Sequence, residues 1–190
     1  PYTTLFRSNQ RRQRTWIRLW SEWKDHSVQQ WDLRKLRDKT RLGDVMKELI
    51  IDAFAGGGGA SVGIEMALGR PVDIAINHDP DAILMHKTNH PDTLHLTEDI
   101  FKVNLKKYVK GQHVALMWAS PDCTSHSKAK GGKPREKGLR ILPWAVYKHA
   151  KEILPDVVLM ENVEEIQQWG PLDEKGYPIP ERKGEDYKKF

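Results

Sequence analysis

Cysteine is nearly absent from this chain, which has one, Cys123, among 190 residues. A single thiol excludes an internal disulfide framework and any zinc centre built from several cysteines. No apolar run approaches the roughly 18 residues that a membrane-spanning helix needs, and the first residues lack the pattern of a secretory signal. The sequence therefore predicts a protein of a reducing compartment, the cytoplasm, with no membrane partner.

An excess of positive charge is confined to the first quarter of the chain. Residues 1–45 hold 11 Lys and Arg against 5 Asp and Glu, whereas the remaining residues hold 20 against 21. The overall charge is thus weak evidence for a nucleic-acid partner. One later segment is locally basic, with Gly and Pro interleaved, and contains Lys128, Lys130, Lys133, Arg135, Lys137 and Arg140. It is either a solvated surface loop or a loop that grips phosphate groups.

The first 45 residues differ in character from the rest. Residues 1–8 resemble the translation of a sequencing-library adapter and are excluded from fold reasoning. Residues 9–45 form a basic, Trp- and Arg-rich leader in which helical spacing is shown by Trp16, Leu19, Trp20 and Trp23. A partner- or DNA-contacting helix and an unrelated fused sequence both fit. Met46 is a natural start, so residues 46–190 are expected to form the domain.

From residue 49 onward, apolar strands alternate with helical segments. The sequence predicts strands at residues 49–54, 72–76, 94–96, 114–118 and 157–160, and helices at residues 60–68, 81–88, 102–109 and 139–153. This alternation indicates an α/β fold with a doubly wound parallel sheet. Such sheets bind ligands at the carboxyl ends of their strands, where Cys123 is expected on a loop after the fourth strand. There it is either a nucleophile or a small buried side chain.

Several other segments follow strands of this predicted sheet, and each has two interpretations. The glycines at 56–59 suit either a nucleotide-like ligand or a flexible loop. Asp79 and Asp99 are either cofactor-binding residues or helix caps. Glu161 ends the fifth strand, beside the strand that leads to Cys123, and is either a catalytic carboxylate or a surface acid.

Taken together and in order, these segments resemble the cytosine-5 DNA methyltransferase family, most closely its phage-type members. The resemblance covers about residues 50–169. It is carried by Asp52-Ala-Phe-Ala-Gly-Gly-Gly-Gly59, Asn77-His-Asp79, Glu98-Asp-Ile100, Ser120-Pro-Asp-Cys-Thr-Ser-His-Ser127 and Glu161-Asn-Val163. It implies a Rossmann-like methyltransferase sheet. It also implies a cofactor, S-adenosyl-L-methionine, and no metal.

The resemblance assigns roles to individual residues. Cys123 is the nucleophile that adds to a flipped-out cytosine, and Glu161 stabilises the base. Phe54, Gly56 and Gly58 surround the methionine and ribose, His78 packs on adenine, and Asp99 with the Ile100 backbone recognises its edge. Asn77 stands where the family usually has glutamate and shares the ribose with Asp79. Pro121 completes the cofactor residues, and double-stranded DNA is contacted by Ser127, Lys128, Lys130, Lys133, Arg135 and Asn162.

The family continues after its glutamate motif with further strands and a target-recognition domain, which this sequence does not contain. Residues 170–190 are expected to form an exposed connection, and the sheet is expected to be incomplete at its C-terminal side. We therefore expect a fragment that does not catalyse on its own. A cognate restriction enzyme is a further partner that fits the family. Two other classes fit the chain as alternatives: a non-catalytic DNA- or partner-binding module, and another nucleotide-dependent Rossmann enzyme.

Overall fold

The fold is built on a sheet whose centre consists of five parallel strands. The structure, a computed structural model, describes residues 2–7, 16–19, 48–123 and 137–190, the first two segments by their backbone alone. The parallel strands are β3 (Leu49–Ala53), β4 (Ile74–Asn77), β5 (Leu94–Thr97), β6 (Val114–Ala119) and β7 (Val157–Asn162). They lie in the order β7-β6-β3-β4-β5, so the chain leaves β3 in one direction and returns to β6 on its other side. The predicted doubly wound sheet is confirmed.

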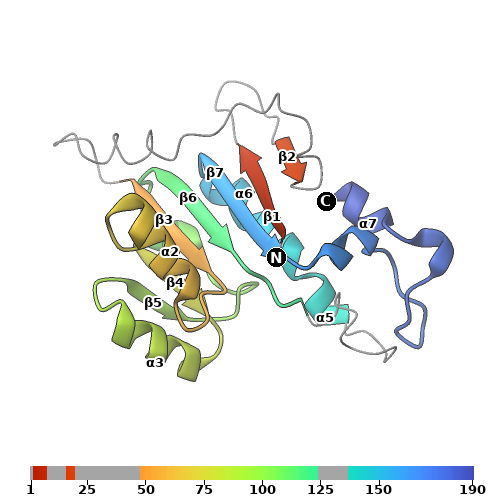
Figure 1. The fold of residues 1–190 in the computed structure, drawn as a ribbon, viewed down its shortest axis with the longest axis horizontal. Coiled ribbons are helices and arrows are strands. Elements are labelled where there is room, and N and C mark those ends of the chain that lie inside the picture. The colour runs from red at the N-terminus through yellow and green to blue at the C-terminus, as the bar shows by residue number, and fades with distance from the viewer. Residues whose placement is uncertain (1, 8–15, 20–47, 124–136) are drawn as a thin grey trace.

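Helices cover both faces of this sheet (Figure 1). The described helices are α2 (Gly59–Leu68), α3 (Pro80–Asn89), α4 (Leu105–Val109), α5 (Lys137–Arg140), α6 (Leu142–Ile153) and α7 (Glu185–Lys189), with 3-10 turns η3 (Glu164–Gln168) and η4 (Pro180–Arg182). Helix α2 packs through Ile64 and Leu68 on one face, and α4 and α6 join the larger core cluster on the other. Because both faces are covered, every residue of β3 is buried.

Two predicted helices have different bounds in the structure. The helix expected at residues 139–153 is two helices, because the chain turns at Ile141 and α6 begins afresh with Pro143 in its first turn. Proline suits that position, since the first amides of a helix need no internal acceptor. The helix expected at residues 102–109 begins only at Leu105.

Two further strands extend the sheet beyond β7. Strand β1 (Tyr2–Arg7), from the segment that the sequence analysis excluded from the fold, pairs antiparallel with β7, and β2 (Trp16–Leu19) pairs with β1. The helical interpretation of the spacing that starts at Trp16 is therefore wrong for residues 16–19. The segments are rich in Tyr, Thr, Phe, Trp and Ile, which favour strands, and β7 offers them an edge to pair with.

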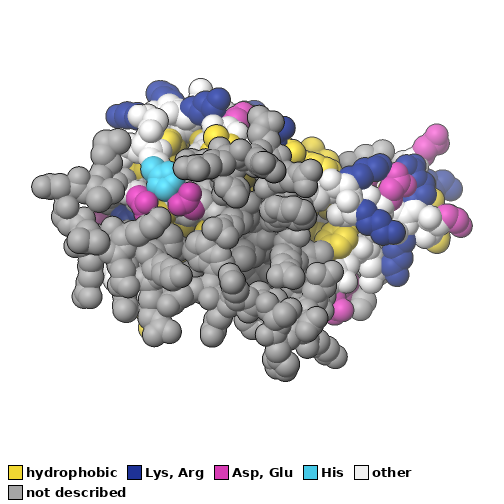
Figure 2. All heavy atoms as spheres, turned by 90° about the horizontal axis from the view of Figure 1, so that it is seen from above, with side chains coloured by type: hydrophobic (Ala, Val, Ile, Leu, Met, Phe, Trp, Pro, Cys, Tyr) yellow, Lys and Arg dark blue, Asp and Glu magenta, His cyan; other side chains and the backbone are white. Residues whose placement is uncertain are grey.

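The C-terminal segment was expected to be exposed, but it packs back onto the domain. Trp169 and Phe190 are buried, and the Trp144 ring lies 5.7 Å from the Trp169 ring and 5.4 Å from the Phe190 ring. Arg140 donates from Nη2 to the Gly170 carbonyl at 2.7 Å. Basic and acidic side chains intermingle on the outside of this segment, at the right of Figure 2. Aromatic burial therefore anchors residues 170–190, while their charges face solvent.

None of the helices in the described ranges combines the length and apolarity that crossing a bilayer requires.

Candidate active site

The glycine-rich turn follows β3 at the carboxyl edge of the sheet. Positive φ angles occur at Phe54 (65°), Gly56 (47°) and Gly58 (100°), so the backbone turns sharply three times before α2 begins. The Ala55 amide donates to the Ile76 carbonyl at 2.9 Å, which joins the turn to β4. Glycine is the default residue for such angles, whereas Phe54 holds a conformation that costs a side chain about 1 kcal/mol or more.

Helix α3 and its C-cap lie directly behind this turn and leave no room for side chains at Gly57 and Gly58. A Cβ atom at Gly58 would lie 2.7 Å from Nε2 of His90, and one at Gly57 would lie 3.0 Å from the Met85 sulfur. Two constraints therefore favour glycine at position 58: its positive φ angle, and the His90 ring that a side chain would overlap. The turn fits a bound nucleotide-like ligand, because its backbone is bare of side chains and opens the first turn of α2.

The loop with Cys123 begins where β6 ends and is joined to the glycine-rich turn. The Ser120 amide donates to the Ala53 carbonyl at 3.2 Å, and the Ser120 hydroxyl donates to the Phe54 carbonyl at 3.3 Å. Cys123 is half-buried and free. The expectation that it lies on a loop at the carboxyl end of a strand is confirmed, and a half-buried thiol there is accessible to a ligand.

Strand β7 brings Glu161 to the same edge. It runs parallel to β6 with Met160 opposite Ala119, so Glu161 and Cys123 follow adjacent paired residues. Glu161 is half-buried. The buried Asn162 donates from Nδ2 to the Pro121 carbonyl at 3.2 Å, and its Oδ1 accepts from the Val163 amide at 2.9 Å. The Asn162 amide thus holds the loop of Cys123 against β7, and its contact with DNA stays a prediction.

The segment after β4 is a helix start. The Asn77 side chain accepts from the Asp79 amide at 2.9 Å, and Oδ1 of Asp79 accepts from the amides of Asp81 at 2.9 Å and Ala82 at 3.4 Å. The capping interpretation of Asp79 is confirmed. His78 and Asp79 are both exposed beside the glycine-rich turn, so capping leaves their other atoms accessible to a ligand.

The segment after β5 is held from both sides. Oδ1 of Asp99 accepts from the Phe101 amide at 2.9 Å, which forms a turn rather than the cap of α4. Ile100 is buried, and its carbonyl accepts from Nε2 of His149 on α6 at 2.6 Å. The rigid Ile100 backbone is therefore a consequence of tertiary packing, and the sequence analysis missed His149.

The predicted DNA-binding residues of the basic loop lie outside the described residues: Ser127, Lys128, Lys130, Lys133 and Arg135. Arg140, grouped with that loop by sequence, is buried and bound to Gly170, so it belongs to the C-terminal packing.

A buried polar chain behind the glycine-rich turn was also missed. Ser61 donates to Oδ2 of Asp52 at 2.7 Å, Nε2 of His86 lies 3.0 Å from the Ser61 hydroxyl, and Nδ1 of His86 lies 2.9 Å from Nε2 of His95. Burial raises the pKa of Asp52 to about 6. Burial, then His90 and His95, lowers the pKa of His86 to about 4. Three of the eight histidines within ten residues, His86, His90 and His95, were the available signal.

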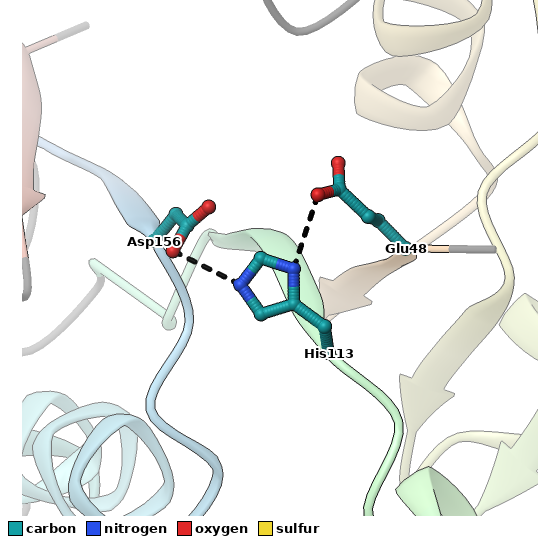
Figure 3. Close-up of side chains that lie close together, drawn as sticks. All are labelled: Glu48, His113 and Asp156. Carbon is teal, nitrogen blue, oxygen red and sulfur yellow. Dashed lines mark hydrogen bonds and ion pairs between the residues drawn. The ribbon is translucent and has the colours of Figure 1, made fainter. Parts of the chain in front are cut away.

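The opposite, amino edge of the sheet carries a second polar cluster. His113, before β6, lies between Glu48, before β3, and Asp156, before β7 (Figure 3). Its Nδ1 is 3.1 Å from Oε1 of Glu48 and its Nε2 is 3.0 Å from Oδ1 of Asp156. Imidazole and carboxylates are also metal ligands. Here each ring nitrogen faces a different carboxylate, so the arrangement is a hydrogen-bonded bridge, called below the amino-edge bridge.

Comparison with known proteins identifies the family. Residues 48–169 match the family described as C-5 cytosine-specific DNA methylase. The curated type II methyltransferase M.AquIA of Picosynechococcus sp. is 28% identical over 131 residues, which are 65% of this chain and 52% of M.AquIA. The crystal structure of an E. coli prophage-encoded protein, described as a DNA modification methyltransferase, is 30% identical with a TM-score of 0.55. The match covers 64% of this chain and 34% of that protein.

The chain thus spans about half the length of the curated relative that it matches. The parallel strand order and the likeness to the prophage protein agree on a Rossmann-like methyltransferase sheet. The matched residues contain the glycine-rich turn, Cys123 and Glu161. The chain belongs to the C-5 cytosine-specific DNA methylase family.

Proposed function

We propose that this chain carries the cofactor and nucleophile segments of an enzyme that methylates C5 of cytosine in double-stranded DNA. The observation that carries the proposal is the hydrogen bond from Asn162 to the Pro121 carbonyl, which links the strand of Glu161 to the loop of Cys123. The bonds of Ser120 link the same loop to the glycine-rich turn. Three segments that the chemistry needs therefore meet at one edge of the sheet.

S-adenosyl-L-methionine supplies the methyl group when it is bound. The glycine-rich turn fits its amino-acid and ribose portion, because Gly56 and Gly58 keep the backbone bare. The residues proposed to hold the cofactor are Phe54, Gly56, Gly58, Asn77, His78, Asp79, Asp99, Ile100 and Pro121. Of these, exposed His78 and Asp79 lie beside the turn and are free to face the adenosine.

Cys123 and Glu161 provide the chemistry on the base. C5 of cytosine is a poor nucleophile until a thiolate adds to C6, so Cys123 forms an Sγ–C6 bond and the ring becomes an enamine. Glu161 donates a hydrogen bond or proton at N3 and stabilises the electron density that this addition moves into the ring. After C5 is methylated, it loses its proton to a base, the electron pair returns, and the Sγ–C6 bond breaks.

The thiol reaches C6 only if the cytosine leaves the base stack, which costs a few kcal/mol. The basic loop, with Ser127, Lys128, Lys130, Lys133 and Arg135, is proposed to contact the backbone around the flipped base. Since the chain spans about half of M.AquIA, we expect these 190 residues to bind the cofactor without turnover.

The test uses the native protein, expressed from its source gene, and DNA containing 5-fluorocytosine. Fluorine at C5 blocks release of the thiol, so a denaturation-resistant protein–DNA adduct should accumulate with S-adenosyl-L-methionine. The Cys123→Ser variant should form none, and Glu161→Gln should form it more slowly, by on the order of a hundredfold, while binding cofactor normally. An adduct that persists in Cys123→Ser would refute the nucleophile assignment. DNA affinity with no adduct in the wild type would favour a binding module.

A further inference from the structure

The buried chain behind the glycine-rich turn connects four separate elements. Asp52 lies in β3, Ser61 in the first turn of α2, His86 in α3 and His95 in β5. Asp52, Ser61 and His86 have no exposed surface, and His95 is half-buried. Full burial keeps the first three from contacting a ligand directly. Their effect on a bound ligand must pass through the backbone that they hold.

The acceptors along this chain determine where its protons lie. The ionised Asp52 carboxylate only accepts, so Ser61 donates its single hydroxyl proton to it. Ser61 then accepts from Nε2–H of His86, whose Nδ1 accepts in turn from Nε2–H of His95. All three donors point toward Asp52, and both histidines are neutral and protonated at Nε2. A histidine charged at position 86 has no acceptor nitrogen left for His95.

The charged and titratable groups around this hydrogen-bonded chain come from every element packed against it. Glu65 of α2 accepts from Nδ1 of His90 at 3.1 Å, and the His90 ring lies 4.6 Å from the His86 ring. Lys87 of α3 lowers the pKa of His95 in addition to the larger effect of burial. Oδ1 of Asp52 and Nε2 of His90 have no hydrogen-bond partner among the described residues. Further positive charge on α3 is therefore disfavoured, which favours the neutral forms of His86 and His95.

Asp52 and Ser61, the first two members of the hydrogen-bonded chain, flank the glycine-rich turn. Asp52 lies two residues before Phe54, and Ser61 lies three residues after Gly58. His90, one turn along α3 from His86, occupies the space where a Gly58 side chain would be. Moving His86 would therefore move both the start of α2 and the ring that supports Gly58.

We propose that His86 and His95 are positioning residues of the cofactor site, which fix the glycine-rich turn through Ser61 and Asp52 without contacting the cofactor. This inference rests on the proposed function for its ligand, S-adenosyl-L-methionine or its demethylated product. The hydrogen-bond chain itself is independent of that ligand. It can be measured in the protein alone.

The first experiment measures the affinity of the 190-residue chain for S-adenosylhomocysteine by calorimetry at neutral pH. His86→Leu, which removes the donor and acceptor at similar volume, should weaken binding about tenfold or more. His86→Gln retains a donor near Ser61 and should recover most of that loss. The matched control, His113→Leu at the opposite edge, should bind like the wild type. A folded His86→Leu variant with unchanged affinity would overturn the proposal.

A general loss of stability predicts a different pattern. If His86→Gln and His113→Leu lost affinity in step with their melting temperatures, His86 would be structural only and the proposal would fail. A wild-type chain that does not bind S-adenosylhomocysteine contradicts the proposed cofactor. The hydrogen-bond chain from His95 to Asp52, called the relay, is then tested by the second experiment.

The second experiment determines histidine tautomers in the wild type by ¹⁵N NMR of the imidazole rings, which needs neither a variant nor a ligand. His86 and His95 should both be neutral and protonated at Nε2 at neutral pH. Protonation of His86 at Nδ1, or of both nitrogens, would overturn the relay.

Discussion

The two edges of the same sheet hold their polar side chains in opposite ways. At the carboxyl edge, Asp52, Ser61 and His86 are fully buried, and Asn162 is 5% exposed. At the amino edge, the side chains of His113 and Asp156 are 35% and 30% exposed, and that of Glu48, the third member of the amino-edge bridge, is 13% exposed. The buried polar groups at the carboxyl edge therefore depend on particular partners, whereas solvent can replace a partner of His113 or Asp156 at the amino edge.

This difference follows from where helices begin and strands end. Strands β3 and β4 lead at the carboxyl edge into tight turns that open α2 and α3, and the packing of these helices removes water from the side chains behind them. At the amino edge the strands enter from loops, and polar groups there bond one another between neighbouring loops. Arg70, for example, bonds Asp73 at 3.1 Å and the Glu48 carbonyl. Fixed geometry is thus concentrated where the chemistry is proposed.

The largest effect is expected at Gly58. Gly58→Ala should cost at least about 2 kcal/mol of unfolding free energy, because alanine is strained at a φ of 100° and its Cβ would overlap His90. Gly63→Ala, inside α2 with nothing within 4 Å of its Cβ, should be neutral or stabilise by up to about 1 kcal/mol. Urea unfolding of both variants measures the contrast. Equal effects would mean that α3 does not support the turn.

The next effect is expected at Asn162. Asn162→Ala removes the donor that Pro121 accepts from and should cost about 1 to 3 kcal/mol. Because Cys123 is the single cysteine, its reaction with a thiol reagent reports on this loop alone and should accelerate. The exposed Asn89 provides the control, since Asn89→Ala should change stability by less than about 0.5 kcal/mol. Unchanged Cys123 reactivity would show that the Asn162 bond does not hold the loop.

The dependence of stability on pH should change in opposite directions at Asp52 and His86. The folded-state pKa of Asp52 is raised from 3.8 to about 6, so the fold binds more protons there and gains stability from this group as pH falls from 6 to 4. The pKa of His86 is lowered from 6.5 to about 4, so its contribution is lost as pH falls through that range. Compared with the wild type, His86→Gln should lose less stability on acidification, and Asp52→Asn more.

Urea unfolding midpoints, measured for both variants and the wild type across this pH range, give the two differences. Differences of the same sign would contradict the protonation states that the relay requires.

The smallest effect is expected at the amino-edge bridge. His113→Ala should cost about 1 kcal/mol or less, because the ring is partly exposed and salt screens its bonds. The loss should shrink further in high salt, and combining it with Asp156→Asn should add little. Cofactor affinity and Cys123 reactivity should not change. A change in either would remove the distinction between the two edges.

Much of the carboxyl edge was predictable from local patterns. The apolar runs gave the five parallel strands, and breakers such as Pro121 and the glycines gave the turns at their ends. The arrangement of β6 beside β7 followed from the usual winding of such sheets. The pairing of residues 2–7 and 16–19 with the sheet was not predicted, because a short segment with strand propensity gives no sign of which edge it will find.

The residues that hold the site were much less predictable. Ser61, His86 and His95 lie in three elements up to 34 positions apart, and no spacing marks them as partners. The bond of the Asn162 amide to Pro121 inside the protein was not predicted. Residues 170–190 look like a polar connection by composition, and the rings of Trp144 and Trp169, which give Phe190 a place to pack, are not marked as its partners by any local pattern.

The sequence by itself determined that the residues proposed to carry the chemistry lie at the ends of strands, because the cysteine, carboxylate and glycine motifs are local in the chain. Only the tertiary structure decided how they are held. Packing α3 against the glycine-rich turn removes water from Asp52, Ser61 and His86, and a buried polar group must then find its partner within the protein. That partner is fixed by which elements touch, and local sequence does not encode it.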